Sequence, residues 1–217
     1  IRPDAWISGS FFWHESLKYS SEDMKNDSLK LLCKYKPRVI SSEFFTSNEV
    51  RHNTRLFEVG LYAAQTFNRK QNDKKDVLIA CGKGGSVKTQ TREFVKFIAT
   101  KEKTRFHRVW VEPDILPHKY PDWMMPAKFT HEMFQSVLAA VIRPGVGTVT
   151  NSLLSGARIF SFYESDNNEM KLNASRVQLY KVGEDASTID SAWHQAELFV
   201  VDKKSQLEHF KTVKNIN

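Results

Sequence analysis

Short apolar runs alternate with longer amphipathic segments over the first 180 residues of the chain. The runs are bounded by Gly, Pro or charged clusters, as strands are, whereas the longer segments repeat their apolar residues at helical spacing. We expect strands at 5–13, 38–45, 76–82, 106–113, 127–129, 140–143 and 158–164, and helices at 21–35, 88–103, 131–140, 148–156 and 167–180. The run 5–13 has the composition of a buried strand, and 46–62 that of a connector. This alternation predicts an α/β fold: a Rossmann-like, doubly wound parallel sheet with helices on both faces.

Length and charge limit what such a fold can contain. With 217 residues, 41% of them hydrophobic, the chain can form one complete domain and part of another. The net charge of +7 favours an anionic partner, but Lys and Arg are scattered, with the densest cluster at 68–75. Nucleic-acid binding needs a basic patch or stripe, so we expect no nucleic acid and a small anionic ligand instead.

Cysteine content and hydropathy bear on the setting of the protein. Cys33 and Cys81 make neither a disulfide framework nor a zinc site, which favours a cytoplasmic location. No apolar run approaches the about 20 residues that span a bilayer, and we expect no transmembrane segment. The first residue is Ile1 rather than Met, which indicates processing, an excised domain or missing residues. Scattered histidines, with no DxD or HExxH motif, predict no metal and no cofactor.

Two glycine-rich turns follow expected strands. In "RPGVGT" (143–148), Gly145 and Gly147 allow backbone angles that other residues avoid, and they let a ligand approach the peptide plane. The N–H groups of the following residues would point outward at the positive end of a helix dipole, and Thr148 adds a hydroxyl. "CGKGGS" (81–86) has the same layout, with Lys83 adding charge. Either turn alone is typical of a plain tight turn, but two at one edge of a sheet predict a pair of contacts to a diphosphate.

Residues 127–177, from "AKFTHEM" through "GVGTVTNSLLSG" to "NASRV", resemble the C-terminal, donor-binding half of GT-B fold glycosyltransferases. They are most similar to the branch that includes the bacterial transferase adding N-acetylglucosamine to the lipid-linked muramyl peptide. "CGKGGS" resembles the first glycine-rich loop of that half, so the resemblance covers roughly 76–185. Neither turn is a P-loop or a dinucleotide-binding fingerprint.

The resemblance implies a site spread over four segments. The residues implied around the nucleobase are Phe129, Thr130 and Met133. Those implied around the diphosphate are Gly145, Val146, Gly147 and Thr148 on one side, and Gly84, Gly85 and Ser86 on the other. Asn168 and Glu169 are implied around the transferred sugar, with Asn173 stabilising their loop. Without the family match, Phe129 and Met133 are equally typical of core positions, and Asn168 and Glu169 of a solvated loop.

One position departs from the family pattern. The family commonly has a glutamate that binds the ribose hydroxyls on the helix after "GxGT", and here that position is Asn151. An amide can still bond a hydroxyl, but without the strength of a charge-assisted bond. Asn151 therefore leaves two questions open: how strongly the site binds the ribose, and which donor nucleotide it takes.

Residues 1–58 resemble a remnant of the N-terminal, acceptor-binding half with its connector, and 59–217 the donor domain. His14 and Glu15 end the first expected strand, so either could assist proton transfer from an acceptor as a catalytic residue; a structural histidine beside aromatic residues is the alternative. A remnant of one or two strands would expose Phe11, Phe12 and Trp13 and favour self-association.

The sequence therefore predicts binding of a nucleotide-diphosphate sugar, UDP-linked, by a chain that is an incomplete hexosyl-type glycosyltransferase. The intact protein would transfer the sugar to an unidentified acceptor without a metal, since backbone N–H groups and helix dipoles stabilise the departing diphosphate. Two alternatives stay open: a nucleotide-sugar epimerase or hydrolase on the same fold, and a binding module without catalytic activity.

Overall fold

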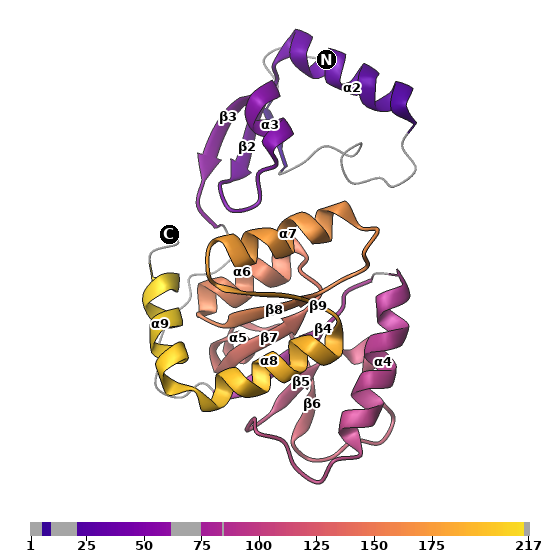
Figure 1. Ribbon diagram of the computed structural model, residues 1–217, viewed down its shortest axis with the longest axis vertical. Coiled ribbons are helices and arrows are strands. Elements are labelled where there is room, and N and C mark those ends of the chain that lie inside the picture. The colour runs from indigo at the N-terminus through magenta and orange to yellow at the C-terminus, as the bar shows by residue number, and fades with distance from the viewer. Residues whose placement is uncertain (1–5, 10–20, 62–74, 84, 215–217) are drawn as a thin grey trace.

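The computed structural model describes residues 6–9, 21–61, 75–83 and 85–214 (Figure 1). Its strands are β1 (Trp6–Ser8), β2 (Arg38–Ser42), β3 (Arg55–Val59), β4 (Asp76–Ala80), β5 (Val109–Val111), β6 (Met124–Pro126), β7 (Val137–Ile142), β8 (Arg158–Phe162) and β9 (Gly183–Ser187). Its helices are α2 (Glu22–Tyr35), α3 (Asn48–Asn53), α4 (Gly85–Ala99), α5 (His131–Ser136), α6 (Val146–Ser155), α7 (Asn168–Leu179), α8 (Ile189–Val201) and α9 (Lys203–Val213), with a 3-10 turn, η1, at Pro113–Ile115.

The larger sheet has six parallel strands in the order β6-β5-β4-β7-β8-β9. Numbered from β4, this is the order 3-2-1-4-5-6 of the doubly wound Rossmann fold. The order reverses between β4 and β7, and in such sheets the crevice at the carboxyl ends of these two strands is where ligands bind. The predicted fold class, a Rossmann-like parallel α/β sheet, is confirmed.

Helices cover both faces of this sheet, and each face has its own core. Val77 and Ile79 of β4 pack with side chains of α4 and α8, whereas Leu78 and Ala80 pack with side chains of α5 and α6. Because a parallel sheet is buried on both faces, its central strands are uninterrupted apolar runs. This is why β4 and the second half of β7 could be identified from sequence.

A second sheet, of three parallel strands in the order β1-β2-β3, forms the N-terminal unit together with α2 and α3. This unit lies at one end of the molecule, next to α7 (Figure 1). The loop after β2 makes the contact: the Phe44 ring stacks on Tyr180 with centroids 4.9 Å apart, and Arg176 donates to the Thr46 carbonyl at 3.0 Å. Phe45, only 1% exposed, joins the core on the α6 face.

The N-terminal unit differs most from expectation. Trp6 and Ile7 in β1 are 50% and 41% exposed, so the prediction of a buried strand there is wrong for the part that the structure describes. The connector expected at 46–62 contains α3 and β3, which gives this sheet three strands rather than one or two. Strand β3, "RLFEV", includes the exposed charged residues Arg55 and Glu58, so it lacks the apolar run by which a buried strand is identified in sequence.

Further corrections concern the larger sheet. The strand expected at 127–129 lies at β6, three residues earlier, and the helix expected at 131–140 stops at Ser136. The chain passes from α5 into β7 without a loop, so no Gly or Pro marks the change. Helix α6 ends, as predicted, at Gly156, which has a left-handed φ of 90°. Across the described residues, no helix combines the length and apolar content needed to cross a membrane.

Candidate functional site

Those predicted site residues that the structure describes lie on loops at the carboxyl edge of the six-stranded sheet or on the helices that follow these loops. Along this edge, the loop with Phe129 follows β6, Glu112 follows β5, turn 81–86 follows β4, and turn 143–148 follows β7. Asn168 and Glu169 come after β8, at the start of α7. The edge therefore carries five separate sequence segments, on both sides of the point where the strand order reverses.

The start of α6 differs from that of the other helices whose preceding residue is described. Six helices (α2, α3, α5, α7, α8 and α9) begin with a side-chain oxygen that accepts a bond from a first-turn N–H group. Helix α6 begins at Gly145, which supplies no such oxygen. Its first N–H groups therefore remain open at the positive end of the helix, a position that favours anions.

The glycines of this turn are not required by the fold. Gly145 has a φ of −69°, and Gly147 is helical, so neither adopts the backbone angles that glycine allows and other residues avoid. A Cβ atom added at either glycine would meet nothing within 4 Å. What the glycines provide is open space directly above the N–H groups of the α6 turn.

Two side chains, those of Arg143 and Asn173, form buried polar bonds beside the α6 turn. Arg143 Nε donates to both carboxylate oxygens of Glu164, at 3.2 and 2.9 Å, and the two side chains are only 16% and 9% exposed. Asn173 Nδ2, almost fully buried, donates to the Pro144 carbonyl at 2.8 Å. Both bonds leave the first N–H groups of α6 unoccupied.

The turn after β4 is held differently. Glu112 Oε2 accepts from the N–H groups of Cys81 and Gly82, each at 2.8 Å, so a carboxylate of the chain itself occupies the first two amides of this turn. Burial, with the charge of Glu112 next in importance, raises the pKa of the Cys81 thiol to about 12. Gly82 has a left-handed φ of 63° and lies at the tip of the turn.

The rest of this turn starts α4. Gly85 and Ser86 are its first two residues and are exposed, while Gly84 lies outside the described residues. A Cβ atom at Gly85 would lie 3.4 Å from Glu164 Oε1. Glu164 thus lies between the two glycine-rich turns, with Arg143 on its other side.

The three residues expected around a nucleobase have different environments. Phe129 is 42% exposed and has a left-handed φ of 51°, an uncommon conformation for a bulky residue. Thr130 caps α5, accepting from the Met133 N–H at 3.4 Å. Met133 is only 4% exposed and packs in the core on the α6 face. Phe129 and Thr130 are thus exposed, whereas Met133 is a core residue.

The residues expected around a sugar begin α7. Asn167 caps this helix, Asn168 is exposed, and Glu169 is half-buried. Burial raises the pKa of Glu169, and the Arg143 guanidinium opposes that shift. Asn151, on the second turn of α6, is half-buried.

Three charged residues of this edge were not found by sequence reasoning: Glu112, Arg143 and Glu164. Glu112 and Arg143 directly follow a strand, and Glu164 lies two residues after one; that position was the available signal. His14 and Glu15, the candidate catalytic residues, lie outside the described residues. Within the part of the chain that the structure describes, no group of three or more His, Cys, Asp or Glu side chains is placed to hold a metal ion.

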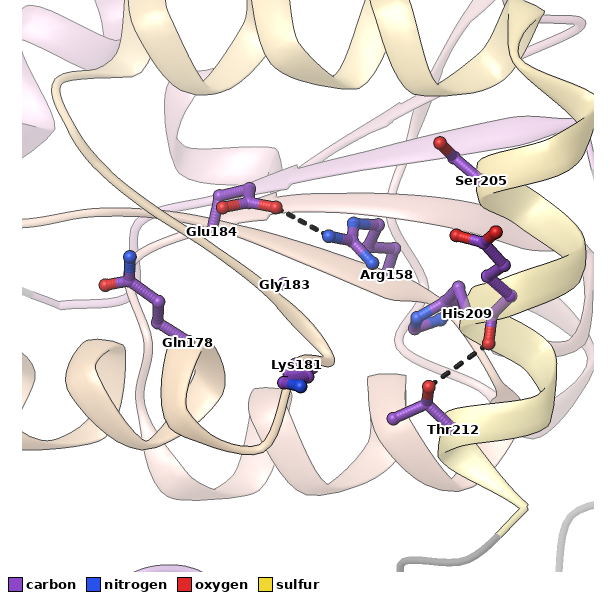
Figure 2. A pocket seen from close by; sticks show the side chains of 9 residues that line it. Arg158, Gln178, Lys181, Gly183, Glu184, Ser205, His209 and Thr212 are labelled. Carbon is purple, nitrogen blue, oxygen red and sulfur yellow. Dashed lines mark hydrogen bonds and ion pairs between the residues drawn. The ribbon is translucent and has the colours of Figure 1, made fainter.

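A separate cavity of about 350 Å³ lies at the opposite, amino edge of the sheet, between the ends of β8 and β9 and helix α9 (Figure 2). Arg158 and Glu184 pair across it at 2.5 Å, and Lys181 and His209 also line it. None of the predicted site residues contributes to this cavity. The two edges of the sheet are thus chemically distinct.

Comparison with known proteins adds to this geometry. No family model matches the chain, and no curated protein matches it. Among solved structures, it resembles CalG4, the calicheamicin glycosyltransferase, with a TM-score of 0.57 and 15% identity over 92% of this chain and 56% of that one. It also resembles Arabidopsis thaliana UGT89C1 complexed with UDP-L-rhamnose, with a TM-score of 0.60 and 12% identity over 97% of this chain and 59% of that one.

A third similar structure is the spinosyn rhamnosyltransferase SpnG, with a TM-score of 0.59 and 10% identity over 91% of this chain and 61% of that one. SpnG is also known in complex with thymidine diphosphate. The chain has the fold of the GT-B glycosyltransferases. It spans 56 to 61% of the lengths of these three proteins. At such identities, the likeness establishes the GT-B fold alone.

Proposed function

We propose that the carboxyl edge of the six-stranded sheet binds a nucleoside-diphosphate sugar, UDP-linked, and that the intact protein transfers the sugar to an acceptor. The start of α6 carries this proposal, because its first N–H groups are uncapped and lie under open space at Gly145 and Gly147. An N-terminal helix dipole and free amides are suited to the diphosphate. Both nucleotides named in the similar structures, UDP-L-rhamnose and thymidine diphosphate, contain a diphosphate.

Arg143 supplies the cation of the proposed site. It lies two residues before Gly145, and its guanidinium is paired with Glu164 rather than facing open water. As negative charge develops on the leaving diphosphate, the guanidinium and the α6 amides would stabilise it without a metal ion. Phe129 would flank the base, and Asn168 and Glu169 would contact the sugar.

The finer features of the proposal rest on sequence. The similarity to the N-acetylglucosamine-transferring branch supports a UDP-linked donor, and cysteine usage supports a cytoplasmic setting. We further propose that 1–58 belong to the acceptor side and 59–217 to the donor side, with self-association through the exposed apolar residues of the N-terminal unit.

Calorimetry with UDP and UMP tests the proposal. We expect UDP to bind at least tenfold more tightly, since only UDP places a second phosphate at the α6 amides and a hydrogen bond to a charged group contributes roughly 1.5–3 kcal/mol. Addition of a chelator should not change the affinity for UDP. Equal affinities for UDP and UMP would contradict the diphosphate site.

Measuring sugar transfer distinguishes a glycosyltransferase from a binding module without catalytic activity. The intact protein, if it is an enzyme, should release UDP from UDP-sugars when a suitable acceptor is present, and a binding module should not. The 217-residue chain alone should bind UDP-sugars but show no transfer at rates typical of an intact enzyme. A half-site can hold a donor but cannot orient a nucleophile or exclude water. Robust transfer by the 217-residue chain would contradict the two-domain proposal.

A further inference from the structure

The cavity at the amino edge of the six-stranded sheet takes no part in the proposed function (Figure 2). Its volume of about 350 Å³ falls within the range of roughly 300–1,000 Å³ that small-molecule sites span. Such sites are usually apolar with a few polar groups, whereas every side chain that lines this cavity is polar or charged. A ligand that fits it must therefore form hydrogen bonds over most of its surface.

The charges that line the cavity sum to zero when His209 is neutral. Two cations, Arg158 and Lys181, are balanced by two carboxylates, Glu184 and Glu208. The last turn of α7, which carries Gln178, also ends here, and the negative end of its helix dipole disfavours an anion. A ligand with a net charge would thus meet as much repulsion as attraction, so the lining favours an uncharged ligand.

The innermost ion pair of the cavity is already formed. Arg158 donates to Glu184 at 2.5 Å, its guanidinium lies 5.4 Å from the centroid of the Phe199 ring, and its side chain is only 18% exposed. An ionic ligand would have to separate this pair, which leaves a largely buried charge without its partner. A hydroxyl group need not separate it, because a guanidinium has five N–H donors and a carboxylate about four acceptor positions.

The wall formed by α9 adds hydroxyl groups that can still accept a hydrogen bond. Ser205 Oγ donates to Asp202 Oδ2 at 2.6 Å, and Thr212 Oγ1 donates to the Glu208 carbonyl at 3.1 Å. Each of these hydroxyl oxygens keeps lone pairs for a further donor, and the Gln178 amide offers both a donor and an acceptor at the rim. The cavity therefore presents donors and acceptors together, which suits a ligand whose groups do both.

We propose that this cavity binds an uncharged saccharide, with neighbouring hydroxyl groups bonded to Arg158 and Glu184. One hydroxyl of such a pair accepts from the guanidinium and the other donates to the carboxylate, so the ion pair stays intact. Hydrogen bonds to charged groups are shorter and stronger than those between neutral groups. The inference is independent of the proposed function, because none of the residues assigned to the nucleotide lines this cavity.

The test is an NMR titration of the chain with uncharged sugars at millimolar concentrations: glucose, galactose, mannose, N-acetylglucosamine, maltose and lactose. At least one should shift the amide resonance of Gly183, which lines the cavity, and leave that of Gly147 in place. Glu184→Gln should weaken this binding at least about fivefold, because a charged acceptor becomes a neutral one. Glu102→Gln removes an exposed carboxylate that does not line the cavity, and this matched control should bind as the unmodified chain does.

Several results would overturn the proposal. These are no shift at Gly183 with any of the sugars, a shift at Gly183 with phosphate or acetate alone, and an unchanged affinity in Glu184→Gln. A sugar that shifts only Gly147 would show that it binds at the carboxyl edge instead. If Glu184→Gln does not fold, Gln178→Ala at the exposed rim decides: the affinity should fall about threefold, as for one neutral hydrogen bond, and an unchanged affinity would contradict the site.

Discussion

The two glycine-rich turns have similar sequences, yet the structure holds them in opposite ways. In the turn before α6, Arg143 pairs with Glu164 and Asn173 donates to the Pro144 carbonyl, so neither side chain occupies the first helical N–H groups. In the turn after β4, Glu112 bonds the N–H groups of Cys81 and Gly82 themselves. A glycine-rich strand-to-helix turn is therefore an anion site only where its amides are not already occupied. The turn after β4 is closed by the Glu112 carboxylate, whereas the turn before α6 keeps its first amides open.

The largest effect is expected from the ion pair that holds the α6 turn. Arg143→Ala would leave the Glu164 carboxylate, 9% exposed, without its partner, and we expect the free energy of unfolding to fall by about 3 kcal/mol. Urea denaturation measures this loss. Arg158→Ala is the matched control, because its partner Glu184 is 40% exposed and the loss should be about 1 kcal/mol. Equal losses would show that the Arg143 pair has no special role.

Valine substitutions compare the two turns directly. Gly147→Val should weaken UDP binding roughly a hundredfold, the loss of two charge-assisted hydrogen bonds. The fold should not change, because a Cβ atom there meets nothing within 4 Å. Gly85→Val should weaken UDP binding less than about tenfold, the loss of at most one such bond. Calorimetry with thermal melting checks both, and equal losses of affinity would mean that the turns contribute alike.

Substitution of Asn173 tests the second bond beside the α6 turn, from its amide to the Pro144 carbonyl. Asn173→Ala would leave the Pro144 carbonyl without its buried donor, and we expect a loss of about 2 kcal/mol in the free energy of unfolding. UDP affinity should fall as well, because the turn is no longer fixed. Lys171→Ala, at an exposed position of the same helix, should change neither quantity. A stable Asn173→Ala variant with full affinity would show that the turn holds its shape without this bond.

Glu169 should give the smallest effect, and it depends on pH. Burial raises its pKa above the ordinary value of 4.5, so folding favours the protonated form. Its contribution to stability is present below the unfolded pKa and is lost as pH rises through the folded pKa. Glu169→Gln should therefore be more stable than the unmodified chain at pH 7, by roughly 0.3 kcal/mol for a half-exposed group.

Thermal melting at several pH values checks this prediction. The difference between Glu169→Gln and the unmodified chain should narrow as the pH is lowered toward 4.5. A difference that grows on acidification would mean that the attraction of Arg143 outweighs the cost of burial.

The sequence predicted the central sheet well and the site only in part. The strand β4 is a nearly uninterrupted apolar run, and Gly156 marks the end of α6, so local pattern sufficed there. For β7 only the second half was identified, because α5 passes into it without a turn signal. No elements were assigned after residue 180, where β9, α8 and α9 complete the fold. The bonds of Glu112 to Cys81 and of Arg143 to Glu164 join residues far apart in the chain, and only the parallel pairing of neighbouring strands brings them together.

Helix α7 connects two parts of the molecule that the sequence treats separately. Its first turn carries Glu169 beside Arg143, and its last turns hold Arg176 and Tyr180 against the loop that contains Phe44 and Thr46. Twelve residues of helix form a strut about 18 Å long. If the N-terminal unit rotates, either its contacts with the C-terminal end of α7 break or α7 moves with it. In the second case, the crevice would change its shape each time the unit moves.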